Sequence, residues 1–259
     1  MTKIEWTHRP NMVGVTWNPI TGCTPISEGC KHCYAQRMAT RLAGRFGYPE
    51  DDPFAVTLHP DRLEEPLNWK RPRTVFVCSM GDLFHEDVPW DEIGFVFHEM
   101  TRSPQHTYIL LTKRPHNMYE FLKWFRYQTG TEKEPPAPHI WGLVTAENQE
   151  RANERIPWLL KCPFAVRGVS IEPMLGPVDI LPYLPYETDS GGFSPQGYPI
   201  DATVPGLDWV IVGPETGPGA RDMDLDGARQ VRDQCQAAGV PFFFKCGLLD
   251  GQEWHQWPK

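Results

Sequence analysis

Residues 107–112, TYILLT, and residues 139–145, HIWGLVT, decide the expected fold. Both are short apolar runs with little alternation between apolar and polar positions, which is typical of strands buried on both faces of a parallel sheet. Six more runs of this kind occur along the chain. They span 13–18, 55–59, 74–79, 164–171, 207–213 and 240–245.

The stretches between these runs are predicted to be helices. At 31–43 apolar side chains recur at every fourth position, and 91–102 and 223–238 show a similar helical period. Strands that alternate with helices indicate βαβ units around a parallel sheet. We therefore expect an α/β fold, a full or partial TIM-like (βα) barrel, ahead of an open Rossmann sheet. We expect one domain over residues 1–259, with a loop or lid insertion at about 183–206.

The charge balance narrows the range of partners. The chain has 25 Lys and Arg residues against 33 Asp and Glu residues, and its net charge is −8. Proteins that grip the DNA backbone usually carry a basic surface. The balance therefore counts against an unaided, tight binder of duplex DNA, and it leaves nucleotides, single bases or a basic groove open.

Hydropathy and cysteine usage indicate the compartment. No apolar run is long enough to cross a membrane, and the N-terminus has no apolar core of signal-peptide length, so we expect a cytoplasmic protein without a membrane partner. Seven cysteines, an odd number, argue against a disulfide framework. They favour metal binding or redox chemistry.

The pattern Cys23-x6-Cys30-x2-Cys33 is the sharpest chemical signal. Three thiols on one loop suit a soft metal centre, and a [4Fe–4S] cluster with three protein ligands keeps one iron open for a substrate or cofactor. A structural zinc site is the second interpretation, with His32 or a distant cysteine as the fourth ligand. The third is three unconnected buried cysteines. The spacing favours the cluster.

Further motifs extend along nearly the whole chain, and together with the cysteine loop they closely resemble the phage Gp37/Gp68 family, a radical-SAM-like group named for a three-Cys motif. The resemblance implies a barrel of radical-SAM type whose cluster binds S-adenosylmethionine (SAM). Reductive cleavage of SAM then yields a 5′-deoxyadenosyl radical that abstracts hydrogen from a substrate. The motifs are TWNPITGC at 16–23, SMGDLFH at 79–85, LTKRP at 111–115, TAENQ at 145–149, SIEPMLGPVD at 170–179, VGPETGPGAR at 212–221 and VPFFFK at 240–245.

The resemblance also implies partners. Its association with phage genomes suggests a nucleobase or nucleotide in DNA as the substrate, modified by thymine hypermodification or isomerisation or by reversal of a base lesion. An electron donor such as flavodoxin or ferredoxin is expected, and the compartment would be the host cytoplasm if a phage encodes the chain.

Each motif lies at the C-terminal end of a predicted strand, and in barrel enzymes the loops at these ends converge on one mouth. Taken without the family, several of these residues have ordinary alternatives: Asp82 and Glu147 can cap the segment that follows, and Lys113 can lie in an exposed turn. We predict cofactor-binding roles for Ser79, Gly81, Asp82, Lys113, Glu147, Glu172 and Gly213.

Four residues are predicted to take part in the reaction. Cys78 and Cys246 end strands that face the same mouth, so either can donate a hydrogen atom to a substrate radical; a small buried apolar side chain is the more ordinary interpretation. Glu215 and Lys245 are expected to offer polar contacts there.

The helix after the cysteines carries Arg37, Arg41 and Arg45 at every fourth position. A solvated helix face is the default interpretation, and the same row can steer a phosphate-bearing substrate despite the acidic total. Two rivals to a radical-SAM enzyme stay open. One is a zinc-stabilised binding protein, and the other is an iron–sulfur protein that transfers electrons or binds nucleic acid without SAM cleavage.

Overall fold

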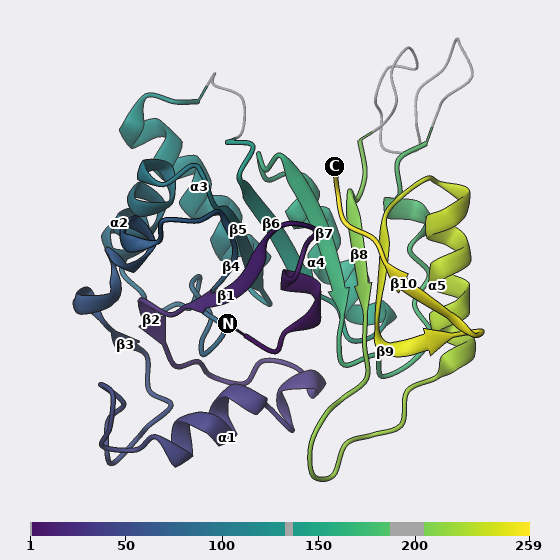
Figure 1. Cartoon of the computed structure of the whole chain (residues 1–259), viewed down its shortest axis with the longest axis horizontal. Coiled ribbons are helices and arrows are strands. Elements are labelled where there is room, and N and C mark those ends of the chain that lie inside the picture. Colours follow the sequence, from purple (N-terminus) through teal and green to yellow (C-terminus); the bar gives the residue numbers. More distant parts are fainter. Residues whose placement is uncertain (1, 133–136, 187–204) are drawn as a thin grey trace.

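A computed structural model describes residues 2–132, 137–186 and 205–259, apart from the side chain of Cys246. Its main feature is an eight-stranded sheet in which each of the first seven strands runs parallel to its neighbour, while the last strand is antiparallel (Figure 1). In spatial order the strands are β1 (Val13–Trp17), β4 (Arg73–Val77), β5 (Thr107–Thr112), β6 (Ile140–Thr145), β7 (Val166–Ile171), β8 (Trp209–Val212), β9 (Phe242–Leu249) and β10 (Gln252–His255).

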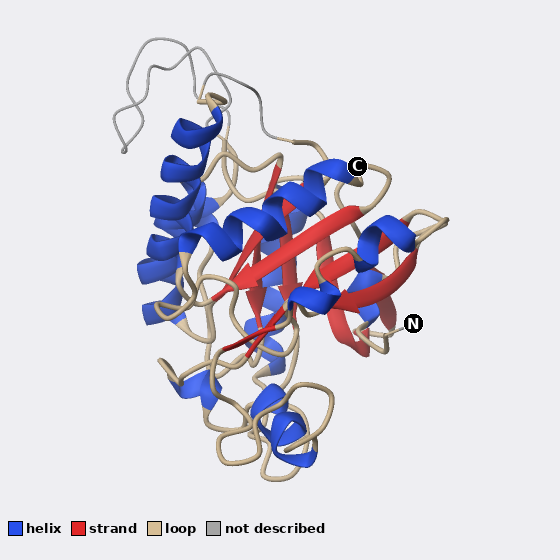
Figure 2. Ribbon diagram, turned by 90° about the vertical axis from the view of Figure 1, so that its left-hand side faces the viewer, coloured by secondary structure: helices blue, strands red, loops and turns tan. Residues whose placement is uncertain are grey.

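The helices lie mainly on the outer face of this curled sheet, and the N-terminus lies inside the curve (Figure 1). Helix α1 is set apart from the others at the lower end of the molecule (Figure 2). The α-helices are α1 (Tyr34–Arg41), α2 (Trp90–Arg102), α3 (Pro115–Thr129), α4 (Gln149–Leu160) and α5 (Leu225–Ala237). Short 3₁₀ helices are η1 (Glu5–Thr7), η2 (Glu28–Cys30), η3 (Pro60–Arg62), η4 (Glu65–Asn68) and η5 (Leu181–Tyr183).

The expected α/β class is confirmed, but the TIM-like barrel of radical-SAM type is wrong. The sheet is open, with β1 at one edge and β10 at the other. Helix η1 contacts β1, β4 and β9, so the N-terminal segment occupies the space between the two sides of the sheet. Antiparallel pairing of β10 with the free edge of β9 leaves β9 no partner edge for β1. These two features replace the closure that a barrel requires.

One predicted strand of the sheet is also wrong. Within 55–59 only β3 (Thr57–Leu58) is extended, and it pairs antiparallel with β2 (Ile20–Thr21) in a separate two-stranded sheet. The predicted insertion at about 183–206 falls largely on residues 187–204, which lie outside the described residues. Across the described parts of the chain, no helix has the length and apolar character needed to cross a membrane.

Both faces of the main sheet are buried, which explains why its strands show little alternation. The outer face joins the larger core, with Val77, Leu110 and Val144 among its strand residues. The inner face forms a second core of Ile109, Trp141, Leu143, Trp209, Ile211 and Phe243, and Trp6 of η1 packs into it. Because β1 and β4 to β9 are parallel, their C-terminal ends all lie at the same end of the sheet.

Candidate functional site

A pocket of about 700 Å³ opens at the C-terminal ends of the parallel strands. One wall is the cysteine loop, with Cys23, Cys30 and Cys33. The opposite wall is built from residues at the ends of consecutive strands, so the sheet brings together motifs that are far apart in the sequence. These residues are Ser79, Asp82, Lys113, Arg114, Thr145, Ser170, Glu172 and Glu215, together with Lys245, which lies within β9 just after the part that pairs with β8.

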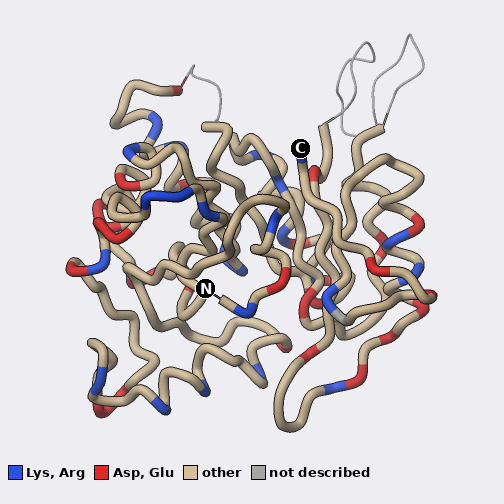
Figure 3. The backbone as a smooth tube through the Cα atoms, in the orientation of Figure 1, with Lys and Arg blue, Asp and Glu red and all other residues tan. Residues whose placement is uncertain are grey.

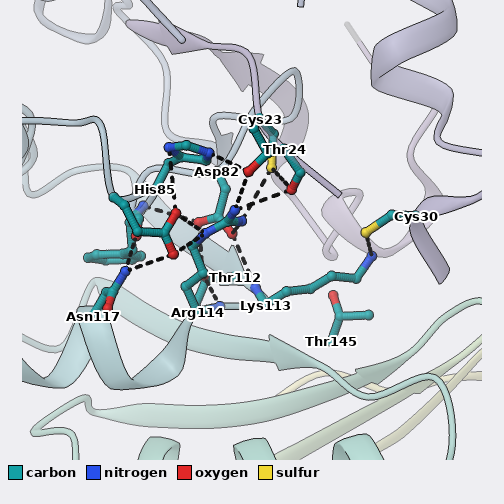
Figure 4. Close-up of polar contacts among 12 residues, drawn as sticks. Cys23, Thr24, Cys30, Asp82, His85, Thr112, Lys113, Arg114, Asn117 and Thr145 are labelled. Atoms are coloured by element: carbon teal, nitrogen blue, oxygen red, sulfur yellow. Dashed lines mark hydrogen bonds and ion pairs between the residues drawn. The ribbon is translucent and has the colours of Figure 1, made fainter. Parts of the chain in front are cut away.

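Arg114 holds the first cysteine (Figure 4). Its Nη1 donates to Cys23 Sγ at 3.3 Å and to Asp82 Oδ2 at 3.3 Å, and its Nε donates to the Glu86 carboxylate at 2.8 Å. Its Nη2 donates to both the carbonyl and the hydroxyl of Thr24. Arg114 is 5% exposed, and every N–H of its guanidinium donates a hydrogen bond. Arg114 therefore fixes the start of the cysteine loop against the end of β5.

Asp82 completes this buried arrangement from the β4 side. Its carboxylate accepts hydrogen bonds from the Thr112 hydroxyl at 2.7 Å, from the Phe84 and Lys113 backbone amides, and from Arg114. A buried carboxylate with four donors has few lone pairs left for a ligand. The structure thus places Asp82 at the pocket as predicted, and its contacts make it an anchor for the loops.

Lys113 reaches the second cysteine. Its Nζ donates to Cys30 Sγ at 3.6 Å and lies 3.3 Å from Glu147 Oε1. The Glu147 side chain is fully buried, and its other oxygen accepts from Arg155 Nη1 at 2.9 Å, while Ser27 donates to Oε1. Arg155, Glu147 and Lys113 therefore form a row of alternating charge that is buried at Arg155 and Glu147 and ends, at the partly exposed Lys113, next to Cys30.

Gly29 lies directly on this row. A Cβ at position 29 would come within 2.4 Å of Glu147 Oε1 and 2.5 Å of Glu147 Cγ. Real Cβ atoms do not approach so closely, so only glycine lets the loop that carries Cys30 rest against the Glu147 side chain. Glu147 is thus placed behind the cysteine loop, and it does not line the pocket.

The two cysteines differ in acidity because their surroundings differ. Burial raises the pKa of Cys23 to about 11, the Asp82 carboxylate adds to the rise, and Arg114 opposes it. Burial also acts to raise the pKa of Cys30, but the charge of Lys113 and hydrogen bonds from the backbone of Ile26 and Ser27 outweigh it, so this pKa is lowered.

Cys33 precedes α1, and its carbonyl accepts the Arg37 amide of the first helical turn. Among residues 2–132, 137–186 and 205–259, no three His, Cys, Asp or Glu side chains are grouped closely enough to hold one metal ion. In the rotamers seen here Cys23 and Cys30 are held separately by cationic partners. All three thiols nevertheless line the same pocket.

The loop after β8 is tied to the cysteine loop. Arg221 binds Glu215 through Nε at 2.9 Å, and its Nη2 donates to the Glu28 carbonyl at 3.0 Å. Hydrogen bonds from Arg221 lower the pKa of Glu215 to about 2. Nearby, Arg37 Nη2 donates to the Thr216 carbonyl at 3.1 Å. Glu215 is therefore at the pocket as predicted, as part of a loop-to-loop contact.

The far side of the pocket is polar and less crowded. Lys245 donates to Glu172, and Gly213 leaves room for this pair, because a Cβ there would meet Lys245 Cδ at 3.1 Å. Thr145 and Ser170 also line the pocket (Thr145 is labelled in Figure 4), and neither side-chain hydroxyl makes a hydrogen bond to another described residue. The two hydroxyls and the Lys245–Glu172 pair can therefore contact a ligand in the pocket.

The remaining predicted residues fall near the β4 end. The Ser79 hydroxyl donates to Asn18 Oδ1 at 3.1 Å, and Gly81 packs on the Gly22 backbone, where a Cβ would lie 2.7 Å from the carbonyl oxygen. Cys78 also lines the pocket, and burial raises its pKa to about 12. Cys246 is in β9, and its side chain lies outside the described residues.

Sequence reasoning missed several residues that organise the site. Arg155, Ser27 and Glu86 were not singled out, and Thr145 and Ser170 were quoted only within longer motifs. A signal for Arg155 was present: it lies on the same face of α4 as the buried residues Ala152, Ile156 and Leu159, where a solvated charge is not expected. Thr145 and Ser170 show no such pattern.

Fold and pocket together define an α/β protein with a cysteine-lined pocket at the C-terminal ends of parallel strands. The family model described as "Protein of unknown function (DUF5131)" matches residues 1–257, and the chain belongs to this family. No curated protein and no solved structure matches the chain. The family description assigns no activity, so the radical-SAM activity that the sequence resemblance implies stays a prediction.

Proposed function

We propose that the chain is an iron–sulfur enzyme that holds a [4Fe–4S] cluster through Cys23, Cys30 and Cys33 and binds SAM beside it. One observation carries this proposal. Three cysteines of a single short loop line the same pocket as the polar residues at the ends of consecutive parallel strands. A purely structural metal site would not need such a pocket, whereas a cluster with one open iron does.

The donor set fits the cluster. Thiolates are soft ligands that suit iron–sulfur centres, and in a cluster each thiolate binds a different iron atom, so the three need not converge on one point. Lys113 and Arg114 lie within hydrogen-bond distance of Cys30 and Cys23. Two cations so placed offset the negative charge that three thiolates bring into a partly buried site.

The pocket also fits SAM in size and chemistry. Its volume lies within the range of about 300–1,000 Å³ that is usual for small-molecule sites. Thr145 and Ser170 offer hydroxyls to an amino-acid or ribose group, and Glu172 and Lys245 offer a carboxylate and an ammonium. When the cluster is bound, it supplies the electron for reductive cleavage of SAM, and the chain positions the ligand and shields it from water.

Cys78 suits a further step at this site. A thiol donates a hydrogen atom only in its protonated form, and burial raises the pKa of Cys78 to about 12, so this thiol stays protonated at neutral pH. A nucleotide in DNA as the substrate, and flavodoxin or ferredoxin as the electron donor, stay predictions from the resemblance.

The proposal is tested by anaerobic reconstitution with iron and sulfide, followed by dithionite and SAM, with 5′-deoxyadenosine as the readout. We expect 5′-deoxyadenosine from the wild type and from Cys162→Ala, which changes a core cysteine away from the pocket. Cys30→Ala should yield none. A reconstituted protein that holds zinc and shows no cluster absorbance would overturn the proposal in favour of a zinc-stabilised binding protein.

A further inference from the structure

We propose that the exposed face of α1 and the turn after it bind the phosphate backbone of a single-stranded nucleic acid. The strand would lie beside the pocket, so that one of its nucleotides can enter. Entry of a nucleotide for reaction rests on the proposed function, whereas backbone binding does not.

The charge of this segment is the first observation. Between Glu28 and Glu50 the chain has no Asp or Glu, although the protein as a whole has a net charge of −8. The same stretch holds four cations, and the ion pairs of the described residues include none of them. They are Lys31, Arg37, Arg41 and Arg45.

Most cations elsewhere on the described helices are neutralised. Arg151 of α4 and Arg229 of α5 each lie within 4.0 Å of at least one carboxylate. In contrast, Arg41 and Arg45 are exposed, and Arg45 donates to the Arg41 carbonyl, which leaves both charges to solvent. Figure 3 shows Lys and Arg spaced along α1 at the lower end of the molecule. Cations one helical turn apart suit successive phosphates along a strand.

Exposed aromatic rings are the second observation. Tyr34, at the start of α1, is 47% exposed, and Phe46, in the turn after it, is 73% exposed. Phe46 has φ of 53°, which is uncommon for a bulky residue, and its carbonyl is held by Arg62. An aromatic ring kept in solvent by a fixed turn offers a stacking surface, and unpaired bases stack on such rings with little sequence preference.

The position of the surface is the third observation. His32, Cys33, Tyr34 and Gln36 line the pocket, and Arg37 lies one turn further along the helix. The row of cations therefore starts at the pocket and runs away from it along α1. The acidic remainder of the protein repels a polyanion, which confines it to this track. Stacking on Tyr34 and Phe46 requires unpaired bases, so a single strand fits better than a duplex.

Fluorescence anisotropy with a short fluorescein-labelled single-stranded oligodeoxynucleotide tests the proposal. We expect Arg41→Gln/Arg45→Gln to weaken binding at least about tenfold at low salt. The slope of log K against log salt should also become shallower by about 1.4, since each phosphate contact to a single strand contributes about 0.7. The matched control, Lys70→Gln/Lys123→Gln, removes two exposed cations that lie outside α1 and the turn after it, and it should bind like the wild type.

Equal binding by the wild type and the α1 variant would overturn the proposal, and so would no binding by the wild type at low salt. Equally strong competition by an unlabelled duplex would overturn the single-strand assignment. The iron content of the same samples separates this inference from the proposed function. Binding that depends on Arg41 and Arg45 in a protein that takes up no iron would leave the strand surface standing and remove the iron–sulfur enzyme.

Discussion

Lys113 and Arg114 are neighbours in the sequence, but they hold different cysteines in different ways. Arg114 uses all its donors on Cys23, Thr24, Asp82 and Glu86, and it is almost fully buried. Lys113 is a point charge between Cys30 and Glu147, and its side chain keeps 21% of its surface exposed.

The difference separates two tasks within one pocket wall. A guanidinium with every donor satisfied can hardly move, so Arg114 sets the geometry of the loop. An ammonium with a spare donor can follow its partner, so Lys113 supplies charge to Cys30 and to whatever Cys30 binds. The pKa values follow the same division, with that of Cys23 raised and that of Cys30 lowered.

The largest effect on the free energy of unfolding is expected at Arg114. Arg114→Met leaves the buried Asp82 carboxylate without its cation, and it should lower the free energy of unfolding by about 3–5 kcal/mol. Urea denaturation measures this loss. Arg114→Lys keeps the charge without the planar set of donors, and it should recover only part of the stability. If Arg114→Met were as stable as the wild type, the hydrogen bonds of Arg114 would not be what holds the cysteine loop in place.

The next largest effect is expected at Gly29, where the cysteine loop rests against the buried Glu147 side chain. Gly29→Ala places a methyl group against Glu147 and should cost about 1–3 kcal/mol of unfolding free energy. Gly176→Ala is the matched control, because a Cβ there has nothing within 4 Å. Equal stability of the two variants would mean that the loop can move off Glu147 without cost.

Replacing Lys113 should lower the free energy of unfolding by less than the loss of Arg114, and it should also lower the reactivity of the Cys30 thiol. Lys113→Met loses a hydrogen bond to a charged group, worth about 1.5–3 kcal/mol at most, since Glu147 keeps Arg155 and Ser27. Because Lys113 acts to lower the pKa of Cys30, the variant should hold less thiolate at neutral pH, and iodoacetamide should alkylate Cys30 more slowly in cluster-free protein.

The same labelling experiment compares the two cysteines directly. In the wild type Cys30 should react faster than Cys23, whose pKa is about 11. Peptide mass spectrometry gives both rates in one sample. Faster labelling of Cys23, or an unchanged Cys30 rate in Lys113→Met, would contradict the division between the two residues.

The smallest effect is expected at the ion pair of Glu215 and Arg221, since Arg221 also contacts the cysteine loop through the Glu28 carbonyl. The pKa of Glu215 is lowered from 4.5 to about 2, so the pair stabilises the folded state above about pH 4.5, and this contribution is lost as pH falls toward 2. In Glu215→Gln the melting temperature should therefore fall less steeply over this range. Parallel curves for wild type and variant would contradict the assignment.

Local elements were largely predictable from the sequence, and closure of the sheet was not. The run at 107–112 coincides with β5, because an apolar β-rich stretch needs only its own residues to be recognised. Strand β10 (Gln252–His255) was missed because it is short, lies at the edge and has no apolar run. Whether β1 pairs with the last strand depends on Trp6 and η1 filling the inside, which strand periodicity does not report.

The strand-end motifs placed several residues correctly at one pocket, Ser79, Asp82 and Glu172 among them, because parallel strands bring their C-terminal ends to the same end of the sheet. They did not predict that Glu147 lies behind the cysteine loop. The side-chain partners of these residues could not be predicted from the sequence. The sequence does not indicate that Arg114 donates hydrogen bonds to the cysteine loop or that Glu147 lies against Gly29. Both contacts depend on the path of that loop in the folded protein. Pairings between distant side chains require the tertiary structure.

The most direct test of the central claim is the iron and acid-labile sulfide content per chain after anaerobic reconstitution. We predict about four of each in the wild type and in Cys235→Ala, which changes a core cysteine, and almost none in Cys23→Ala, Cys30→Ala or Cys33→Ala. Zinc in place of iron, or an iron content unaffected by loss of any of the three loop cysteines, would contradict the account.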